Sequence, residues 1–291
     1  MSIPRSLQER VHVSSPSLLV RHEFLLRRLH SLTGLVPVGA YMVVHLMVNS
    51  TLLTGVSVFQ RNVYQIHSLE DALVIVEWAF IFLPILFHAI LGVVIVYGGL
   101  PNLRSYPQSA NYRYVLQRAT GLIAFAFIVY HVFHLHGWFH AQWWLDYVAK
   151  PLGGANFRAY NAASTLGEAM ASPVILVVYS VGVLACVFHL ANGIWSMGIT
   201  WGVWTSPAAQ HRALVGCGVF GVLLAVVGMS ALFGVATVDI DEARMVEDRM
   251  YNVRVESGDV KENEKKRAAD RPERETSSRS EDGSAVVSQS N

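Results

Sequence analysis

Five long stretches of this chain contain none of the four charged residue types, and each stretch is long enough to cross a membrane. A transmembrane helix needs about 20 predominantly apolar residues, whereas a soluble core is built from shorter apolar runs broken by charged faces. The uncharged stretches cover residues 29–60, 78–103, 119–145, 169–211 and 213–238. The pattern therefore predicts an all-α integral membrane protein, a bundle of five transmembrane helices with spans near 29–53, 72–100, 115–137, 173–199 and 213–237.

Polar segments on both sides of the apolar region divide the chain into three parts. Residues 1–28 are polar and arginine-rich, and residues 29–238 form the predicted membrane domain. From about Asp239 the sequence mixes both charges and contains almost no apolar residues. Such a composition cannot bury enough surface to offset the entropy that is lost on ordering. Residues 239–291 are therefore predicted to form a disordered polar tail.

The placement of arginines predicts the orientation of the helices. The N-terminal segment and the second and fourth connections are rich in arginine, with Arg28, Arg118 and Arg212 among them. The positive residues of the other two connections are balanced by carboxylates such as Glu70 and Glu168. Lys and Arg are enriched in cytoplasmic connections. We therefore expect a multi-pass protein of the cytoplasmic (inner) membrane, with its N-terminus in the cytoplasm and its C-terminus outside.

Net charge and cysteine content add little to this interpretation. The formal net charge is +1 and no basic face is clustered, so nothing predicts a nucleic-acid partner, and the expected surroundings are membrane lipid. The two cysteines, Cys186 and Cys217, lie in apolar stretches. They fit neither a disulfide framework nor a spaced metal site.

Four of the twelve histidines lie deep inside the predicted spans, one in each of the first four: His45, His88, His131 and His189. An ionisable side chain inside a membrane is costly and is a functional candidate by default. A single histidine could serve as a hydrogen bond between helices. Four of them, one in each of four successive helices, are harder to explain in that way.

Depth sorts these histidines into two pairs. Because a helix rises about 1.5 Å per residue, His45 and His131 lie about 25 and 20 Å beyond the arginines at the cytoplasmic ends of their helices. Both are therefore near the outer surface. The second and fourth helices run the other way, so His88 and His189 lie about 17 and 24 Å from the outer ends, toward the cytoplasm. We expect His45 to face His131, and His88 to face His189.

Two facing histidines at one depth can fill the two axial positions of a haem iron. Imidazole binds several metals, but zinc would need about four ligands at one level, and no cysteine or carboxylate is available there. His134 competes with His131 as a ligand but lies less deep. Small residues such as Gly92 and Gly193 leave room for a flat ring, although they also let helices pack closely. The five-helix bundle is thus predicted to hold two haems b.

Several short motifs, taken together in their order and spacing, resemble one family over roughly residues 24–237. The motifs are Arg27-Arg28-Leu29-His30-Ser31, His45-Leu46, Phe82-Leu83-Pro84, His88-Ala89, Leu116-Gln117-Arg118, Tyr130-His131-Val132, Phe188-His189, Asn192-Gly193, Trp195-Ser196 and Thr200-Trp201-Gly202. The chain resembles the di-haem cytochrome b558 membrane subunit of succinate dehydrogenase and fumarate reductase, in particular the Gram-positive type.

The resemblance implies the same four axial ligands in the same pairs, and it implies that His30 and Ser31 hydrogen-bond a propionate of the inner haem. It also implies a membrane anchor for a flavoprotein subunit and an iron–sulfur subunit that oxidise succinate on the cytoplasmic side. Electrons would pass through the inner and then the outer haem to a quinone, expected to be menaquinone. The chain has no cysteine-rich cluster motif, and its single G-x-G-x-x-G spacing, residues 216–221, lies inside a predicted membrane span rather than between a strand and a helix as in a flavin fingerprint. We therefore expect the electron-transfer subunit of the enzyme, which does not act on succinate by itself.

Polar residues at the outer ends of the helices are candidates for the quinone site, because quinone reduction needs groups that supply protons. The candidates are Glu77, His134 and Glu70, together with His67 and His136.

Three other functions remain open from the sequence, and one of them is a structural membrane anchor without haem. A di-haem cytochrome b subunit of another quinone-linked dehydrogenase or hydrogenase would use the same chemistry, although the spacing of the ligands across four helices argues against it. A proton or metal transporter could also use intramembrane histidines. Such proteins favour broken helices and midplane carboxylates, and the apolar stretches contain no carboxylate.

Overall fold

The computed structural model describes residues 22–98, 103, 107–139 and 141–268, and the regular secondary structure in these ranges is entirely helical. Within them, five segments are long and apolar enough to cross a membrane: Glu23–Thr54, Ala72–Tyr97, Ser109–His136, Pro173–Thr200 and Pro207–Thr237. The predicted five-helix membrane architecture is confirmed. Most of the predicted N-terminal segment, 1–21, and the last part of the predicted tail, 269–291, lie outside the described residues.

The first two spans are each assembled from shorter helical pieces. The first consists of α2 (Glu23–Thr33), the π-helical η2 (Gly34–Gly39), α3 (Ala40–Ser50) and the short 3₁₀ segment η3 (Thr51–Thr54). The second consists of α5 (Asp71–Glu77), the π-helical η4 (Trp78–Phe82) and α6 (Leu83–Tyr97). Pro37 lies inside η2, and Pro84 lies in the first turn of α6. Proline removes a backbone donor and clashes with the preceding turn, which explains an irregular turn at each proline.

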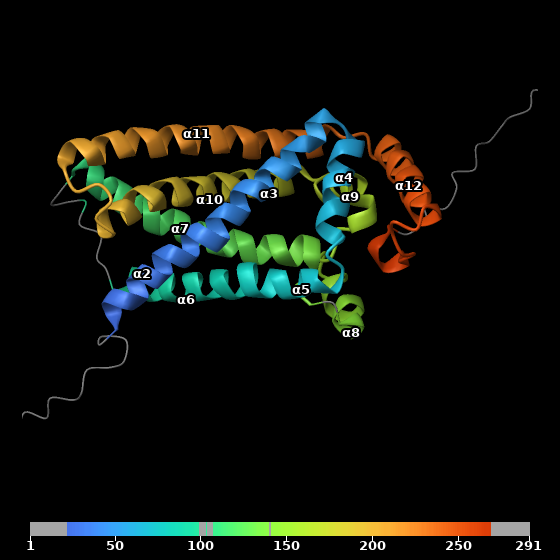
Figure 1. Cartoon of the computed structure of the whole chain (residues 1–291), viewed down its shortest axis with the longest axis horizontal. Helices are drawn as coiled ribbons and strands as arrows, with labels where there is room; N and C mark the ends of the chain where they lie inside the picture. Colours follow the sequence, from blue (N-terminus) through green and yellow to red (C-terminus); the bar gives the residue numbers. More distant parts are fainter. Residues whose placement is uncertain (1–21, 99–102, 104–106, 140, 269–291) are drawn as a thin grey trace, which may run out of the picture.

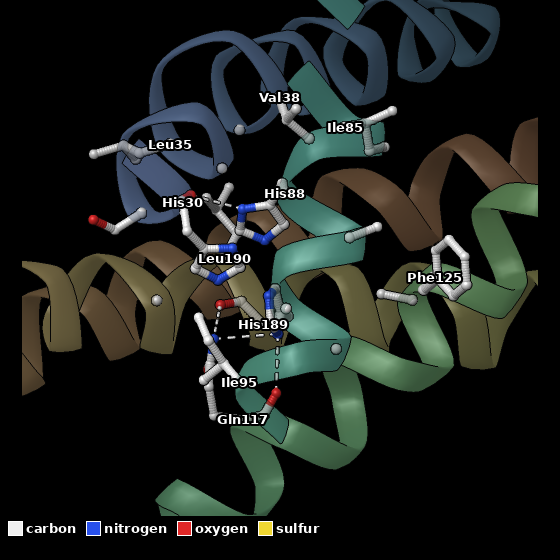
Figure 2. Close-up of a pocket in the computed structure, with 18 of the residues that line it drawn as sticks. His30, Leu35, Val38, Ile85, His88, Ile95, Gln117, Phe125, His189 and Leu190 are labelled. Carbon is white, nitrogen blue, oxygen red and sulfur yellow. Dashed lines mark hydrogen bonds between the residues drawn. The ribbon is translucent and has the colours of Figure 1, made fainter. Parts of the chain in front are cut away.

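The other three spans are single helices, α7 (Ser109–His136), α10 (Pro173–Thr200) and α11 (Pro207–Thr237). Helix α10 packs along both α7 and α11, and α11 also packs along α3, so these four helices form the tight part of the bundle (Figure 1). Helix α6 packs mainly against α2 and has few contacts with α7. The looser packing between these helices leaves the cavity that Figure 2 shows.

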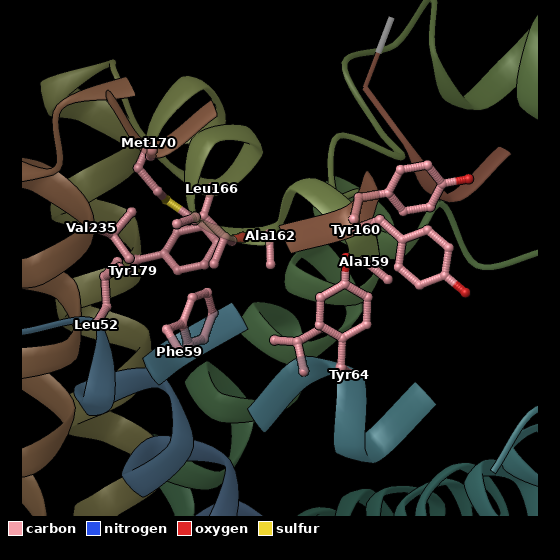
Figure 3. Close-up of a cluster of buried hydrophobic side chains, with 14 residues drawn as sticks. Leu52, Phe59, Tyr64, Ala159, Tyr160, Ala162, Leu166, Met170, Tyr179 and Val235 are labelled. Atoms are coloured by element: carbon pink, nitrogen blue, oxygen red, sulfur yellow. The ribbon is translucent and has the colours of Figure 1, made fainter. Parts of the chain in front are cut away.

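One end of the bundle bears a layer of short helices, and we call it the capped end. The layer contains α4 (Val56–His67), α8 (Gln142–Trp144), η5 (Leu145–Ala149), η6 (Ala159–Asn161), α9 (Ala162–Ala169), α12 (Ile240–Glu256) and η7 (Glu264–Lys266). Figure 1 shows α4, α9 and α12 grouped there. A buried apolar cluster joins the layer to the spans, with Phe59 from α4, Leu166 from α9, Tyr251 from α12 and Tyr179 from α10 (Figure 3). We call the opposite end, with Arg27, Arg28, Arg113 and Arg118, the arginine end.

Helix α12 corrects the prediction for the C-terminal part of the chain. Residues 240–256, predicted to be disordered, form a helix that begins after Asp239, whose carboxylate accepts two backbone N–H groups of the first turn. Ala243, Glu247 and Tyr251 are spaced by four residues and form its buried face. The helix packs against α9, α4 and η6. For residues 240–256 the prediction was wrong, because the composition of a segment does not show that neighbouring helices can supply the rest of its core.

Candidate functional site

The structure brings together in two pairs the histidines that lie deep inside the spans, which are His45, His88, His131 and His189. The ring centroids of His45 and His131 are 5.9 Å apart, with an angle of 82° between the ring planes. Those of His88 and His189 are 6.0 Å apart, with an angle of 85°. In each pair, one histidine comes from an irregular span and the other from a single straight helix. The His45–His131 pair lies toward the capped end and the His88–His189 pair toward the arginine end.

Both rings of the His88–His189 pair are held through Nδ1. His88 Nδ1 lies 2.8 Å from the carbonyl oxygen of His30, and His189 Nδ1 lies 3.0 Å from the carbonyl oxygen of Gln117 (Figure 2). Because a carbonyl oxygen only accepts hydrogen bonds, each Nδ1 must be the protonated nitrogen, and each Nε2 keeps its lone pair. A metal-binding histidine usually has this arrangement, with its second ring nitrogen donating to a carbonyl or carboxylate.

The side chains of Gln117 and Asn192 form a small network around His189. Gln117 Nε2 donates to the backbone carbonyl of His189 at 3.1 Å, and Asn192 Nδ2 donates to Gln117 Oε1 at 2.8 Å. Gln117 Nε2 also lies 3.2 Å from His189 Nδ1. Two donors cannot share one hydrogen bond, so we assign the backbone carbonyl of Gln117 as the partner of His189 Nδ1. The network fixes both the ring and the backbone of His189.

A cavity of about 1000 Å³ runs beside this pair and reaches toward both ends of the bundle. Its lining at the arginine end includes Arg27, Arg28, Arg113 and Arg118. Toward the capped end, its lining includes Trp78, Phe82, Trp138 and Phe139. Its volume is at the upper end of the range for small-molecule sites, about 300–1,000 Å³. The cavity can therefore hold a large ligand with an apolar body and an anionic edge at the arginine end.

Two glycines allow the histidine rings to lie directly against neighbouring helices. A Cβ atom on Gly34 would overlap the ring of His88. A Cβ atom on Gly121 would lie 2.8 Å from Cε1 of His189. Any other residue at these positions would displace a histidine ring, because protein interiors are too closely packed to accept such contacts.

The His45–His131 pair has an aromatic environment. Tyr41 Oη lies 3.5 Å from His45 Nδ1. The rings of Phe127 and Tyr179 lie 5.7 and 5.6 Å from the ring of His131, measured between centroids. These contacts restrict the orientation of both rings.

His30 and Ser31, expected near a haem propionate, both line the cavity. The ring of His30 stacks on that of His88, with 4.0 Å between centroids. Ser31 Oγ accepts a hydrogen bond from Trp201 Nε1 at 3.0 Å and donates one to the carbonyl of Arg28 at 2.9 Å. His30 therefore positions His88 through both its ring and its carbonyl.

The residues predicted to form a quinone site are dispersed in the structure. Glu77 is partly exposed and precedes Trp78, which lines the cavity. His134 is only 6% exposed and packs against α10, where its Nδ1 lies 2.8 Å from Tyr179 Oη. Glu70 Oε2 lies 3.4 Å from Lys261 Nζ at the capped end. Among Glu77, His134 and Glu70, Glu77 is therefore the one next to a cavity-lining residue. His136 also lies there, with its ring centroid 6.1 Å from that of Phe82.

Sequence reasoning missed Arg113, Gln117 and Tyr179 as candidates for the site. Arg113, Gln117 and Gly121 are spaced by four residues on α7 and so share one helix face. All three line the cavity. The spacing of four residues could have identified this face of α7 from the sequence, once Gly121 had been placed beside a ligand. Tyr179 gave no such signal, since a tyrosine in an apolar stretch is common.

Comparison with known proteins identifies the family. No protein-family model matches the chain. The succinate dehydrogenase cytochrome b558 subunit of Bacillus subtilis (strain 168) is 34% identical over 212 residues, which cover 72% of this chain and 96% of the relative. The two sequences are thus similar over nearly the whole length of the relative. This chain also has the five membrane-spanning helices and the paired histidines described above. The chain therefore belongs to the family of succinate dehydrogenase cytochrome b558 subunits.

Proposed function

We propose that this membrane cytochrome b binds two haems b, one between His88 and His189 and one between His45 and His131. The observation that carries the proposal is the spacing of the rings, with 6.0 and 5.9 Å between centroids. An imidazole nitrogen lies about 2 Å from a bound metal ion, so two axial rings on one ion are roughly 6 Å apart. The large angles between the rings are compatible with axial ligation, because each ring can rotate about its own bond to the metal.

The donor set also favours a haem over a metal site made by protein side chains alone. Among the described residues, no three His, Cys, Asp or Glu side chains converge on one point as such a site requires. Two histidines are enough for an iron whose other four ligands come from its own ring. A bound haem supplies one-electron oxidation and reduction. The protein's own contribution is to hold His88 and His189 through Nδ1 and to surround His45 and His131 with aromatic side chains.

The arginine end is the proposed docking face for a flavoprotein subunit and an iron–sulfur subunit of a succinate:quinone oxidoreductase. The relative is named a succinate dehydrogenase subunit, and the positive-inside rule places the arginine end in the cytoplasm, with the capped end and the C-terminus outside. In this arrangement the chain is the membrane anchor and electron-transfer subunit, and succinate reacts on the partner subunits.

The quinone, menaquinone by the family resemblance, is proposed to react at the aromatic part of the cavity toward the capped end. Flat aromatic side chains line this part of the cavity: Trp78, Phe82, Trp138 and Phe139. Glu77 lies next to Trp78 and can supply protons to a quinone. His134 and Glu70, which were also candidates, have partners elsewhere, Tyr179 and Lys261. We therefore assign proton donation to Glu77.

The haem content of the purified full chain tests the central proposal. We expect two haems b per chain by the pyridine haemochromogen assay. His189→Ala and His45→Ala should each lose one haem, and their reduced-minus-oxidised spectra should differ because each retains a different one. His211→Ala is the matched control, since this exposed histidine at the start of α11 lies outside both pairs. One haem or none in the unsubstituted protein would contradict the proposal.

A further inference from the structure

Three of the four arginines at the arginine end of the cavity have identifiable partners. Arg27 Nη2 lies 2.7 Å from Glu23 Oε1. Arg118 Nη2 donates to the carbonyl of Ile95 at 3.4 Å. The guanidinium of Arg28 lies over the rings of Phe24 and Trp201, at 4.3 and 5.4 Å from their centroids.

Arg113 also lies over an aromatic ring, but it differs from these three in having buried guanidinium nitrogens without a hydrogen-bond partner. Its Nε and Nη1 atoms are buried and have no hydrogen-bond partner among the described residues. Its guanidinium carbon lies 4.1 Å from the centroid of the Trp195 ring, which holds the group on the cavity wall. A buried cation without a hydrogen-bonded anion is costly. Two unmatched donors of a guanidinium on a cavity wall therefore indicate an anion that binds there.

The position of Arg113 on α7 relates this anion to the His88–His189 pair. Arg113 precedes Gln117 by four residues, and the carbonyl of Gln117 accepts the hydrogen bond from His189 Nδ1. It precedes Gly121, which touches the His189 ring, by eight residues. These separations correspond to about 6 and 12 Å along one helix face. Arg113 thus lies on the same wall as the His189 ligand, displaced toward the arginine end.

We propose that Arg113 binds a propionate carboxylate of the haem held by His88 and His189, donating from its unmatched Nε or Nη1 together with Nη2. This inference rests on the proposed function, because it needs a haem at that pair. Each of these two edges of a guanidinium, Nε with Nη2 or Nη1 with Nη2, presents two parallel N–H groups that match the two oxygens of a carboxylate. Trp195 orients the group by cation–π contact. The same donors would match the phosphate of a lipid headgroup, so the test must distinguish a carboxylate on the haem from an anion of the bilayer.

The test compares haem b with its dimethyl ester, in which both carboxylates are blocked. Full-length protein in membranes from haem-deficient cells is reconstituted with each compound, and retention at the His88–His189 pair is measured from the optical spectrum. The variants are Arg113→Gln and Arg113→Lys. Arg212→Gln is the control, because it removes one positive charge from an exposed residue of α11 outside the cavity lining.

We expect Arg113→Gln to retain haem b about tenfold or more less tightly than the unsubstituted protein, since hydrogen bonds to charged groups are among the strong ones. The ester should bind both proteins equally, and Arg212→Gln should behave as the unsubstituted protein. Arg113→Lys keeps the positive charge but loses the paired N–H donors of the guanidinium, so its retention of haem b should be intermediate. If Arg113→Gln does not accumulate in the membrane, the retention of haem b and of its ester by Arg113→Lys still tests the inference.

Two results would overturn the inference. One is equal retention of haem b by the unsubstituted protein, Arg113→Gln and Arg113→Lys. The other is an equal loss of haem b and ester in both variants, which would point to a lipid anion or to a structural role for Arg113. Failure of the unsubstituted protein to bind any haem would instead contradict the proposed function, so the two failures are distinguishable.

Discussion

At the scale of single residues, the glycines beside the histidines offer a steric test of the site. Gly121→Ala adds a Cβ atom 2.8 Å from Cε1 of His189, whose ring would have to move. The helix itself tolerates alanine well, so the expected effect is confined to the ligand. We expect this variant to lose one of the two haems while the protein still accumulates in the membrane.

Gly218→Ala is the matched control for that substitution, because a Cβ atom on this glycine of α11 has open space around it. Both variants are measured by haem content per chain and by the reduced-minus-oxidised spectrum. Unchanged haem content in Gly121→Ala would mean that haem binding does not depend on the present position of the His189 ring.

The network around His189 leads to a second prediction. Gln117→Ala removes the side chain that bonds the His189 carbonyl and receives Asn192 Nδ2. The backbone carbonyl of residue 117, which receives His189 Nδ1, remains in place. Loss of groups that support a metal ligand typically weakens metal binding by about 10–100-fold. We expect Gln117→Ala to release one haem faster and Gln142→Ala, at the exposed surface of α8, to leave both in place.

Residues differ in how far their roles could be predicted from the sequence. His45, His88, His131 and His189 stand out because an ionisable side chain in a long apolar run is visible without a structure. Their depths in the membrane follow from their positions along the predicted helices, and the structure brings them together in the expected pairs. The unpaired donors of Arg113 could not be predicted, since they depend on which neighbours α7 meets.

At the scale of elements, long apolar spans are predictable because one strong signal extends over many residues. Helix α12 could not be predicted in this way, because its composition is polar on average and its stability comes from a narrow buried face. Glu247 at the centre of that face is fully buried. Its carboxylate accepts from the backbone N–H of Ala163 at 2.6 Å and from Ser164 Oγ at 2.5 Å. A buried acidic residue that caps α9 looks like a solvated charge in the sequence.

Glu247 gives the capped end a predictable pH dependence. Burial raises its pKa from 4.5 to about 7, against the opposing effects of Ser164, the Ala163 amide and Arg244. The folded state then binds the proton more tightly than the unfolded state. This contribution to stability is fully present below about pH 4.5 and is lost as pH rises through about 7. It amounts to at most about 3 kcal/mol, because one pKa unit is about 1.36 kcal/mol.

The measurement is thermal unfolding of the detergent-purified protein at pH 5 and pH 8, compared with Glu247→Gln. Glutamine cannot titrate, so we expect the variant to lose less stability than the unsubstituted protein between the two pH values. Glu256→Gln, at the exposed end of α12, should keep the original pH dependence. Parallel behaviour of Glu247→Gln and the unsubstituted protein would contradict the assignment.

At the scale of the whole molecule, the two histidine pairs lie one beyond the other between the arginine end and the capped end. The cavity beside them is lined by arginines at one end and by aromatic side chains toward the other. Charge transfer between the two ends therefore crosses the low-dielectric part of the bundle. In the orientation and with the quinone site proposed above, succinate would release its protons in the cytoplasm and the quinone would take up its protons outside.

A compensating proton path would need ionisable groups between the two ends. Fumarate reductases that resemble this family and have such a path contain a glutamate two residues before the fourth-helix histidine. The corresponding residue here is Val187, and the stretch 169–211 contains no carboxylate. Val187 is also buried in an apolar cluster with Leu46 and Leu224. The bundle therefore offers no equivalent of that glutamate, and electron transfer to the outer quinone site should move charge across the membrane.

We therefore predict that succinate:menaquinone activity of the assembled complex depends on the membrane potential. An inside-negative potential drives electrons outward, at about 2.3 kcal/mol per charge per 100 mV. In intact cells or energised proteoliposomes, a protonophore should lower the activity several-fold. Succinate oxidation by a water-soluble acceptor that takes electrons directly from the partner subunits should not change, which controls for damage to the complex. Equal menaquinone activity with and without the potential would mean that protons follow the electrons across the bundle through ordered water, even though no carboxylate lies at the position of Val187.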